Sequence, residues 1–286
     1  MNYREYIIQP DGYGLVHLNP LLVANIVNTK LEQWFENNKF IHYAIDRVQP
    51  DDYAKFSLPL EYTYSMRLQE NRNYDNLKKE VMSSINAKEY QILINIIFET
   101  LAMVYECKLI IETKKQGKSI KDFEKHICGK MRDFEGKSFP EKIILLASLA
   151  KANEMLEILK KMNAIRNCME HRNGIVGKSD CKNRSYIEIK WEYPKLEDSG
   201  REVRVVGGAN TGARPQIAFA KEFFTKETKR FFLGDKIEMD FHDNYKCLYT
   251  INLALKPMID EIYKMVGVSH DRQDLIIKEF KKELSK

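Results

Sequence analysis

Residues 164–174 concentrate side chains that can act chemically on a phosphodiester. This segment holds a guanidinium at Arg166, an amide at Asn167 and an imidazole at His171. An imidazole exchanges protons with reacting groups near neutral pH, and a guanidinium binds a phosphate through parallel N–H donors. These three side chains therefore suit cleavage of RNA without a metal ion.

The reaction that these groups predict is attack of the RNA 2′-hydroxyl on the neighbouring phosphorus. The imidazole of His171 takes the hydroxyl proton or protonates the leaving 5′-oxygen. Arg166 stabilises the extra negative charge of the pentacoordinate transition state, while Asn167 fixes the imidazole tautomer or holds a phosphate oxygen. Because one chain offers one such histidine here, acid–base catalysis from two sides favours a homodimer with the two segments face to face.

The reactive segment is predicted to end a long amphipathic helix. Asn167 and His171 are four residues apart, so they share one helix face. Apolar residues keep helical periodicity from Ile143 to Ile165, and Ser138 is a suitable start for the same helix. Gly174 is a suitable end, which places the reactive residues in the last two turns.

The rest of the chain predicts a mainly α fold, a helical bundle with a small antiparallel β insert. Further helices are expected over residues 21–35, over 90–115 with Asn86 and Glu89 as a capping box, and over 245–265 with Asp243 or Asn244 as the cap. Two short strands are expected near residues 6–8 and 15–18. Alternating apolar residues predict three strands in the insert, over 187–193, 203–205 and 237–241.

The predicted domains are an N-terminal extension, residues 1–60, and a helical domain, residues 61–286, with the β insert at about 183–242. The chain is 44% apolar and 30% charged, the composition of an ordinary globular protein, and its net charge of +5 permits a nucleic-acid partner without requiring one. No secretory signal or membrane span is expected, so the predicted location is cytoplasmic. The five cysteines form no Cys-x-x-C pair, and no metal-binding motif is present, so neither a metal nor another cofactor is expected.

The run Arg166-Asn167-Cys168-Met169-Glu170-His171, at the end of a bundle helix, resembles the signature of the HEPN superfamily. That signature is an Arg, often followed by Asn or another polar residue, then a short run of residues and a His. Arg166, Asn167 and His171 match motif positions. Glu170 and Arg172 match no fixed family position and are candidates only for orienting the other side chains.

The resemblance covers the motif well and the helical frame of residues 61–266 loosely. It implies a HEPN-like bundle that dimerises with its motifs at the interface, and the metal-independent endoribonuclease (RNase) activity of many members. Such proteins act in toxin–antitoxin, abortive-infection and other antiviral defence systems. The resemblance therefore also implies an RNA substrate and an antitoxin or other defence-system partner.

Two other functions remain open from the sequence. Some HEPN proteins bind a nucleotide, RNA or a partner protein without catalysis, and this chain would then be a binding module of the same fold. The spacing of Arg166 and His171 also fits an ordinary surface arginine and a helix-end histidine that stabilises the helix dipole. In that case the protein is a structural or interaction protein.

Overall fold

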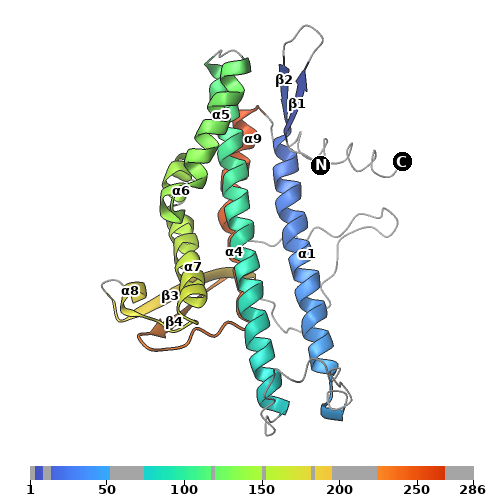
Figure 1. Cartoon of the computed structure of the whole chain (residues 1–286), viewed down its shortest axis with the longest axis vertical. Helices are drawn as coiled ribbons and strands as arrows, with labels where there is room; N and C mark the ends of the chain where they lie inside the picture. The colour runs from blue at the N-terminus through green and yellow to red at the C-terminus, as the bar shows by residue number, and fades with distance from the viewer. Residues whose placement is uncertain are drawn as a thin grey trace, which may run out of the picture.

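The longest helix, α4 (Tyr74–Lys115), is the central element of the fold (Figure 1). The computed structural model describes residues 4–8, 14–51, 74–116, 120–149, 153–181, 184–194 and 224–267. Apolar residues on several sides of α4 are buried, so other helices pack around it rather than along one face. These helices are α1 (Pro20–Arg47), α5 (Ile120–Glu135), α6 (Phe139–Leu146), α7 (Asn153–His171) and α9 (Phe241–Met265).

Polar contacts fix α1 and α9 against the first half of α4. The Nε2 atom of His42 lies 3.0 Å from Oδ1 of Asn86, and Nδ2 of Asn244 donates to the Asn86 carbonyl oxygen at 2.9 Å. Asn86 is thus buried inside α4, and the prediction that it caps a helix is wrong. Its side chain bonds to another helix instead of to its own backbone. The predicted domain boundary near residue 60 lies outside the described residues.

The helix that carries the motif is shorter than the periodicity predicts. The start at Ser138 is confirmed, since its backbone N–H and its hydroxyl both donate to Oε2 of Glu141, at 2.8 and 2.6 Å. However, α6 ends at Leu146, a 3-10 turn covers Ala147–Leu149, and α7 begins only at Asn153. Leu149 is buried in that turn, so the apolar period continues across the break and hides it from the sequence.

Two antiparallel pairs of strands are described. The N-terminal pair, β1 (Arg4–Ile8) and β2 (Gly14–Leu18), confirms the strands expected there. In the insert, β3 (Tyr186–Pro194) confirms the strand predicted at 187–193, and it pairs with β4 (Phe224–Phe232), which was not predicted. The strand predicted at 203–205 lies outside the described residues.

The strand predicted at 237–241 is wrong, so the described insert has two strands and not three. Ile237 and Met239 are buried alternately in an extended link that forms no strand, and Phe241 already belongs to α9. Asp240 caps that helix by accepting from the Asp243 backbone N–H at 2.7 Å, so the cap predicted at Asp243 or Asn244 is displaced. The short helix α8 (Lys178–Cys181) lies between α7 and β3.

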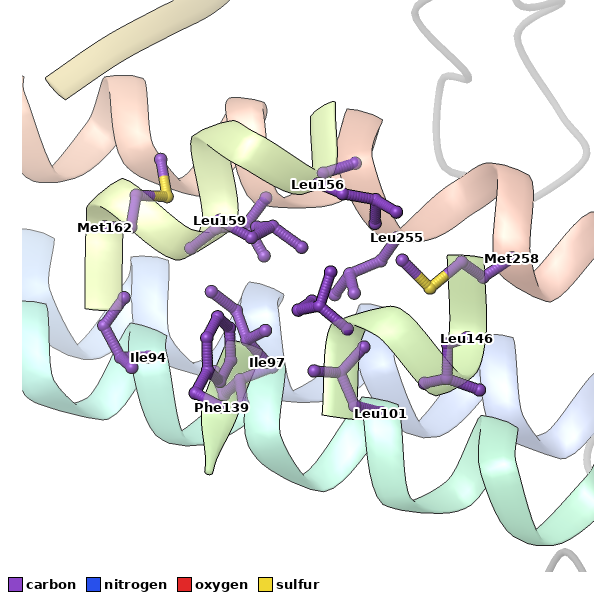
Figure 2. Close-up of a cluster of buried hydrophobic side chains, with 14 of the residues drawn as sticks. Ile94, Ile97, Leu101, Phe139, Leu146, Leu156, Leu159, Met162, Leu255 and Met258 are labelled. Atoms are coloured by element: carbon purple, nitrogen blue, oxygen red, sulfur yellow. The ribbon is translucent and has the colours of Figure 1, made fainter. Parts of the chain in front are cut away.

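Apolar side chains on the inner face of α7 pack in the main core against those of α4 and α9 (Figure 2). Leu159 and Met162 of α7 are fully buried, as are Ile94 and Ile97 of α4 on the opposite side. Burying a large aliphatic side chain contributes about 1.5–3 kcal/mol, so this face holds α7 firmly in place. No described helix is both long and apolar enough to cross a membrane.

Replacing Leu159 with Ala is expected to lower the free energy of unfolding by about 2–5 kcal/mol, because it leaves a cavity in this core. Urea denaturation followed by circular dichroism measures the change. Ile144→Ala is the matched control, since Ile144 of α6 is 64% exposed and its removal should change stability by less than about 0.5 kcal/mol. Equal effects of the two substitutions would contradict this packing.

Candidate functional site

A left-handed turn stops α7 directly after the motif. Asn173 has a φ of 52° and Gly174 a φ of 77°, a region that favours glycine and tolerates asparagine. The Gly174 N–H reaches back six residues to the Cys168 carbonyl oxygen at 3.2 Å, and the same carbonyl accepts the Arg172 N–H at 3.0 Å, so the end of the helix is tied to its last turn. The predicted stop at Gly174 is therefore confirmed, and the turn fixes the direction in which the chain leaves His171.

Backbone hydrogen bonds attach this turn to the link between β4 and α9. The Ile237 N–H donates to the Gly174 carbonyl at 2.8 Å, and the Val176 N–H donates to the Asp235 carbonyl at 2.9 Å. Ile175 and Lys236 form an isolated antiparallel bridge. The end of α7 is thus held from both sides, by the core before the motif and by this bridge after it.

Arg172 is committed to a structural ion pair. Its Nε and Nη2 atoms donate to the two oxygens of Asp180 at 3.1 and 2.6 Å, and Asp180 also accepts from the Gly177 N–H at 2.8 Å. The Asp180 side chain is only 4% exposed. A two-pronged pair of this kind is geometrically specific, so Arg172 shapes the turn beside His171.

Arg166 lies on the side of α7 that faces α4. Its Nη2 is 2.8 Å from Oε2 of Glu170, and its guanidinium carbon is 5.8 Å from the ring centre of Phe98. Nη1 makes a long contact of 3.4 Å with Oδ1 of Asn167. The Nε atom is buried and has no hydrogen-bond partner within the described structure. Arg166 therefore retains donors beyond those that Glu170 and Asn167 use.

His171 is exposed, and no contact joins it to Arg166 or Asn167 within the described part of the chain. At 3.6 residues per turn, Arg166 and His171 point about 140° apart around α7, whereas Asn167 and His171 differ by only about 40°. The structure therefore groups Arg166, Asn167 and Glu170 by contact and leaves His171 separate. Within one chain, Arg166 and His171 do not form a preassembled pair.

Cys168, in the middle of the motif, is not a reactive thiol. Its side chain is fully buried, and Sγ donates to the Ile175 carbonyl oxygen at 3.2 Å. Burial, assisted by Asp180, raises the pKa of this thiol to about 11. Because the thiolate is the nucleophilic form, Cys168 serves the packing of the turn rather than chemistry.

An open groove of about 230 Å³ lies beside the motif, between the end of α7 and the first half of α4. Met169 lines it from α7, Asn173 from the turn that follows, and Ser83 and Ser84 from α4, while Lys236 adds a cation. Arg166 precedes Met169 by three residues, so both lie on the same side of α7, although Arg166 itself does not line the groove. The groove is smaller than the 300–1,000 Å³ typical of small-molecule pockets, which fits a surface site better than an enclosed one.

Sequence patterns did not point to the partners that hold the site residues. Asp180 and Phe98 are far enough from the motif in sequence that no helical spacing links them to Arg172 or Arg166. Among the described residues, no group of three or more His, Cys, Asp or Glu side chains is arranged to hold a metal ion. The expectation of a metal-free reaction thus stays a prediction from the chemistry of the motif.

Comparison of this chain with protein-family models, with curated proteins and with solved structures finds no match. The resemblance to the HEPN superfamily therefore stays a prediction from the motif and its helical setting.

Gly174→Ala is expected to lower the free energy of unfolding by roughly 1–2 kcal/mol, because alanine is strained in the left-handed region. Gly129→Ala is the matched control. Gly129 lies inside α5 with no atom near an added Cβ, so this change should stabilise the protein by roughly 0.5–1 kcal/mol. Thermal unfolding of both variants measures the difference. A stabilising Gly174→Ala substitution would rule out the left-handed turn.

Iodoacetamide applied to the folded protein at neutral pH is expected to label Cys128 first and Cys168 slowly. Cys128 is exposed, whereas Cys107, Cys168, Cys181 and Cys247 are buried. Peptide mass spectrometry after timed quenching identifies the labelled thiols, and Cys128→Ser should remove the fast phase. If Cys168 were labelled as fast as Cys128, Cys168 would be accessible to solvent, which would contradict its burial at the end of α7.

Proposed function

We propose that this protein is a metal-independent endoribonuclease of the HEPN type. The observation that carries the proposal is the placement of the Arg166-to-His171 run at a helix end held by the core and by the turn bridge. A helix end fixed from both sides positions catalytic groups better than a free one does. The partly exposed guanidinium of Arg166 and the exposed imidazole of His171 are both within reach of a polymer on the surface.

Each motif residue has a distinct role in the proposed reaction. His171 moves the proton of the 2′-hydroxyl or of the leaving 5′-oxygen. Arg166, whose side chain is 25% exposed, stabilises the charge on the pentacoordinate phosphorus. Asn167 lies between them on α7 and holds a phosphate oxygen or orients the imidazole. Glu170 keeps the guanidinium in position through the 2.8 Å ion pair.

The separation of Arg166 and His171 on α7 is a reason to expect the proposed homodimer to form the reaction centre from two chains. Two side chains pointing about 140° apart on one helix do not converge on one phosphodiester without a large change in their conformation. A twofold arrangement of α7 ends allows Arg166 of one copy and His171 of the other to flank the same linkage. An RNA target, a cytoplasmic location and a role in toxin–antitoxin or antiviral defence belong to the same proposal.

The second candidate is a HEPN-type module that binds RNA, a nucleotide or a partner without catalysis. The separation of His171 from Arg166 favours this alternative, because the described part of one chain contains no assembled pair of guanidinium and imidazole. A binding role needs Arg166 but does not need His171 to exchange a proton. The two functions therefore differ in their dependence on His171.

Purified protein is expected to cleave RNA in the presence of EDTA, leaving 2′,3′-cyclic phosphate and 5′-hydroxyl ends. Arg166→Ala and His171→Ala should each lower the cleavage rate by about 10²–10⁴-fold, because each removes a group that acts only in the transition state. Denaturing gels with end-labelled transfer RNA and total RNA measure the rate.

The matched controls are Arg132→Ala and His126→Ala, which remove an arginine and a histidine from α5. Both should cleave like the unmodified protein. Unmodified protein that leaves both RNA preparations intact contradicts the nuclease proposal. If intact RNA is bound and Arg166→Ala alone abolishes binding, the non-catalytic module is the correct function.

A further inference from the structure

The outer face of the hairpin formed by β3 and β4 carries aromatic and cationic side chains. The register pairs Tyr186 with Phe232, Glu188 with Arg230 and Lys190 with Thr228. Because side chains alternate along a strand, these six share one face, while Ile187, Ile189 and Trp191 of β3 are buried on the other. We call the six residues the hairpin face.

Two aromatic rings meet at the end of the hairpin face nearest to the motif turn. The ring centres of Tyr186 and Phe232 are 5.9 Å apart, and Phe232 is 52% exposed. The guanidinium carbons of Arg230 and Arg184 lie 4.9 and 5.8 Å from the Tyr186 ring centre. Exposed aromatic rings accompanied by arginines are the side chains on which unpaired nucleic-acid bases stack.

The charges on this face leave an excess of positive charge. Lys161 contacts Glu188 at 2.6 Å, and Arg184 and Arg230 contact it at 3.4 Å. The hydrogen bond from Lys161 holds the pKa of Glu188 below its usual value, so this carboxylate stays charged. Lys190 is a fourth nearby cation and is exposed. Glu192 continues the same face and pairs with Lys226 at 3.6 Å, so two carboxylates stand against five cations and the hairpin face attracts a polyanion.

The hairpin face is physically connected to the motif. Lys161 belongs to α7, the helix that ends at His171. The turn after the motif bridges to Lys236 through Ile175, only a few residues beyond Phe232, and the Leu233 N–H donates to the Ser185 carbonyl at 3.0 Å. Figure 1 shows β3 and β4 beside the end of α7. A strand of RNA at the motif can therefore continue onto the hairpin face.

We propose that the hairpin face is a binding platform for single-stranded RNA. Tyr186 and Phe232 stack on unpaired bases, while Arg230 and Lys190 contact the phosphates. The choice of RNA over other single strands rests on the proposed function; the platform itself rests on the contacts above. It assigns a role to the β insert and selects single-stranded regions as the substrate class.

Single strands fit this face better than duplexes do, because stacking requires bases whose flat faces are free. Bases in an A-form duplex are already stacked on one another, and such duplexes are recognised through phosphates and 2′-hydroxyls. The half-buried ring of Tyr186 and the exposed ring of Phe232 would then contribute nothing to binding. A protein partner with an acidic, apolar surface is the competing occupant and is treated as an outcome of the test.

Fluorescence anisotropy of a labelled single-stranded RNA of about 12 nucleotides tests the platform. The His171→Ala protein is used so that the RNA stays intact, and the same RNA annealed to its complement serves as the duplex. Tyr186→Ala with Phe232→Ala should weaken single-strand binding at least about fivefold, with a smaller effect on the duplex. Arg230→Gln and Lys190→Gln should each lower the salt dependence of binding by about 0.7 in the log–log slope.

The matched control is Phe40→Ala with Tyr43→Ala on α1. Phe40 is 72% exposed, and Tyr43 is 57% exposed with the Arg47 guanidinium 4.7 Å from its ring, so the pair resembles the hairpin pair in composition. This control should bind the single strand unchanged, and circular dichroism should show that both double variants are folded. The proposal is overturned if the two double variants bind equally, or if His171→Ala protein binds no single-stranded RNA, which would leave the face to a protein partner.

These results separate the platform from the nuclease proposal. Single-strand binding that depends on Tyr186 and Phe232, in a protein that never cleaves RNA, supports the platform and refutes the nuclease. Cleavage that survives Tyr186→Ala with Phe232→Ala at unchanged affinity supports the nuclease and refutes the platform.

Discussion

The left-handed turn at Asn173 and Gly174 is the constraint on which the rest of the site depends. It ends α7 immediately after His171 and directs the following residues into the antiparallel bridge between Ile175 and Lys236. The Arg172–Asp180 pair closes the same turn from the side of α8. Because these interactions are backbone bonds and a two-pronged ion pair, they leave the motif side chains free while fixing the helix that carries them.

This constraint divides α7 into sides with different tasks. The inner side, with Leu159 and Met162, anchors the helix in the core. Arg166 faces Phe98 of α4, Asn167 is half-buried, and His171 is exposed. Lys161 reaches the hairpin face through Glu188. One helix thus links the proposed reaction centre to the proposed RNA platform, and the proposed homodimer is what would bring guanidinium and imidazole together.

The sequence predicted the helical character, the start at Ser138 and the stop at Gly174, because capping chemistry and left-handed turns depend on local residues. The predictions failed where the order of buried residues looked like that of a different element. The buried Leu149 hid the break before α7, and alternating burial of Ile237 and Met239 imitated a strand. The pairing of β3 with β4, and the Asp180 and Phe98 contacts of the site, are tertiary interactions that no local period encodes.

The central claim is that Arg166 and His171 contact the same RNA linkage when RNA is bound. A nuclear magnetic resonance titration with 2′-O-methyl RNA, which cannot be cleaved by 2′-hydroxyl attack, tests it directly. Side-chain labels report the Arg166 guanidinium and the His171 imidazole separately, and phosphorus resonances report the RNA. The account predicts that both side chains shift with one common saturation curve and that both show contacts to one phosphate. A shift of Arg166 alone, or of neither side chain, would contradict it.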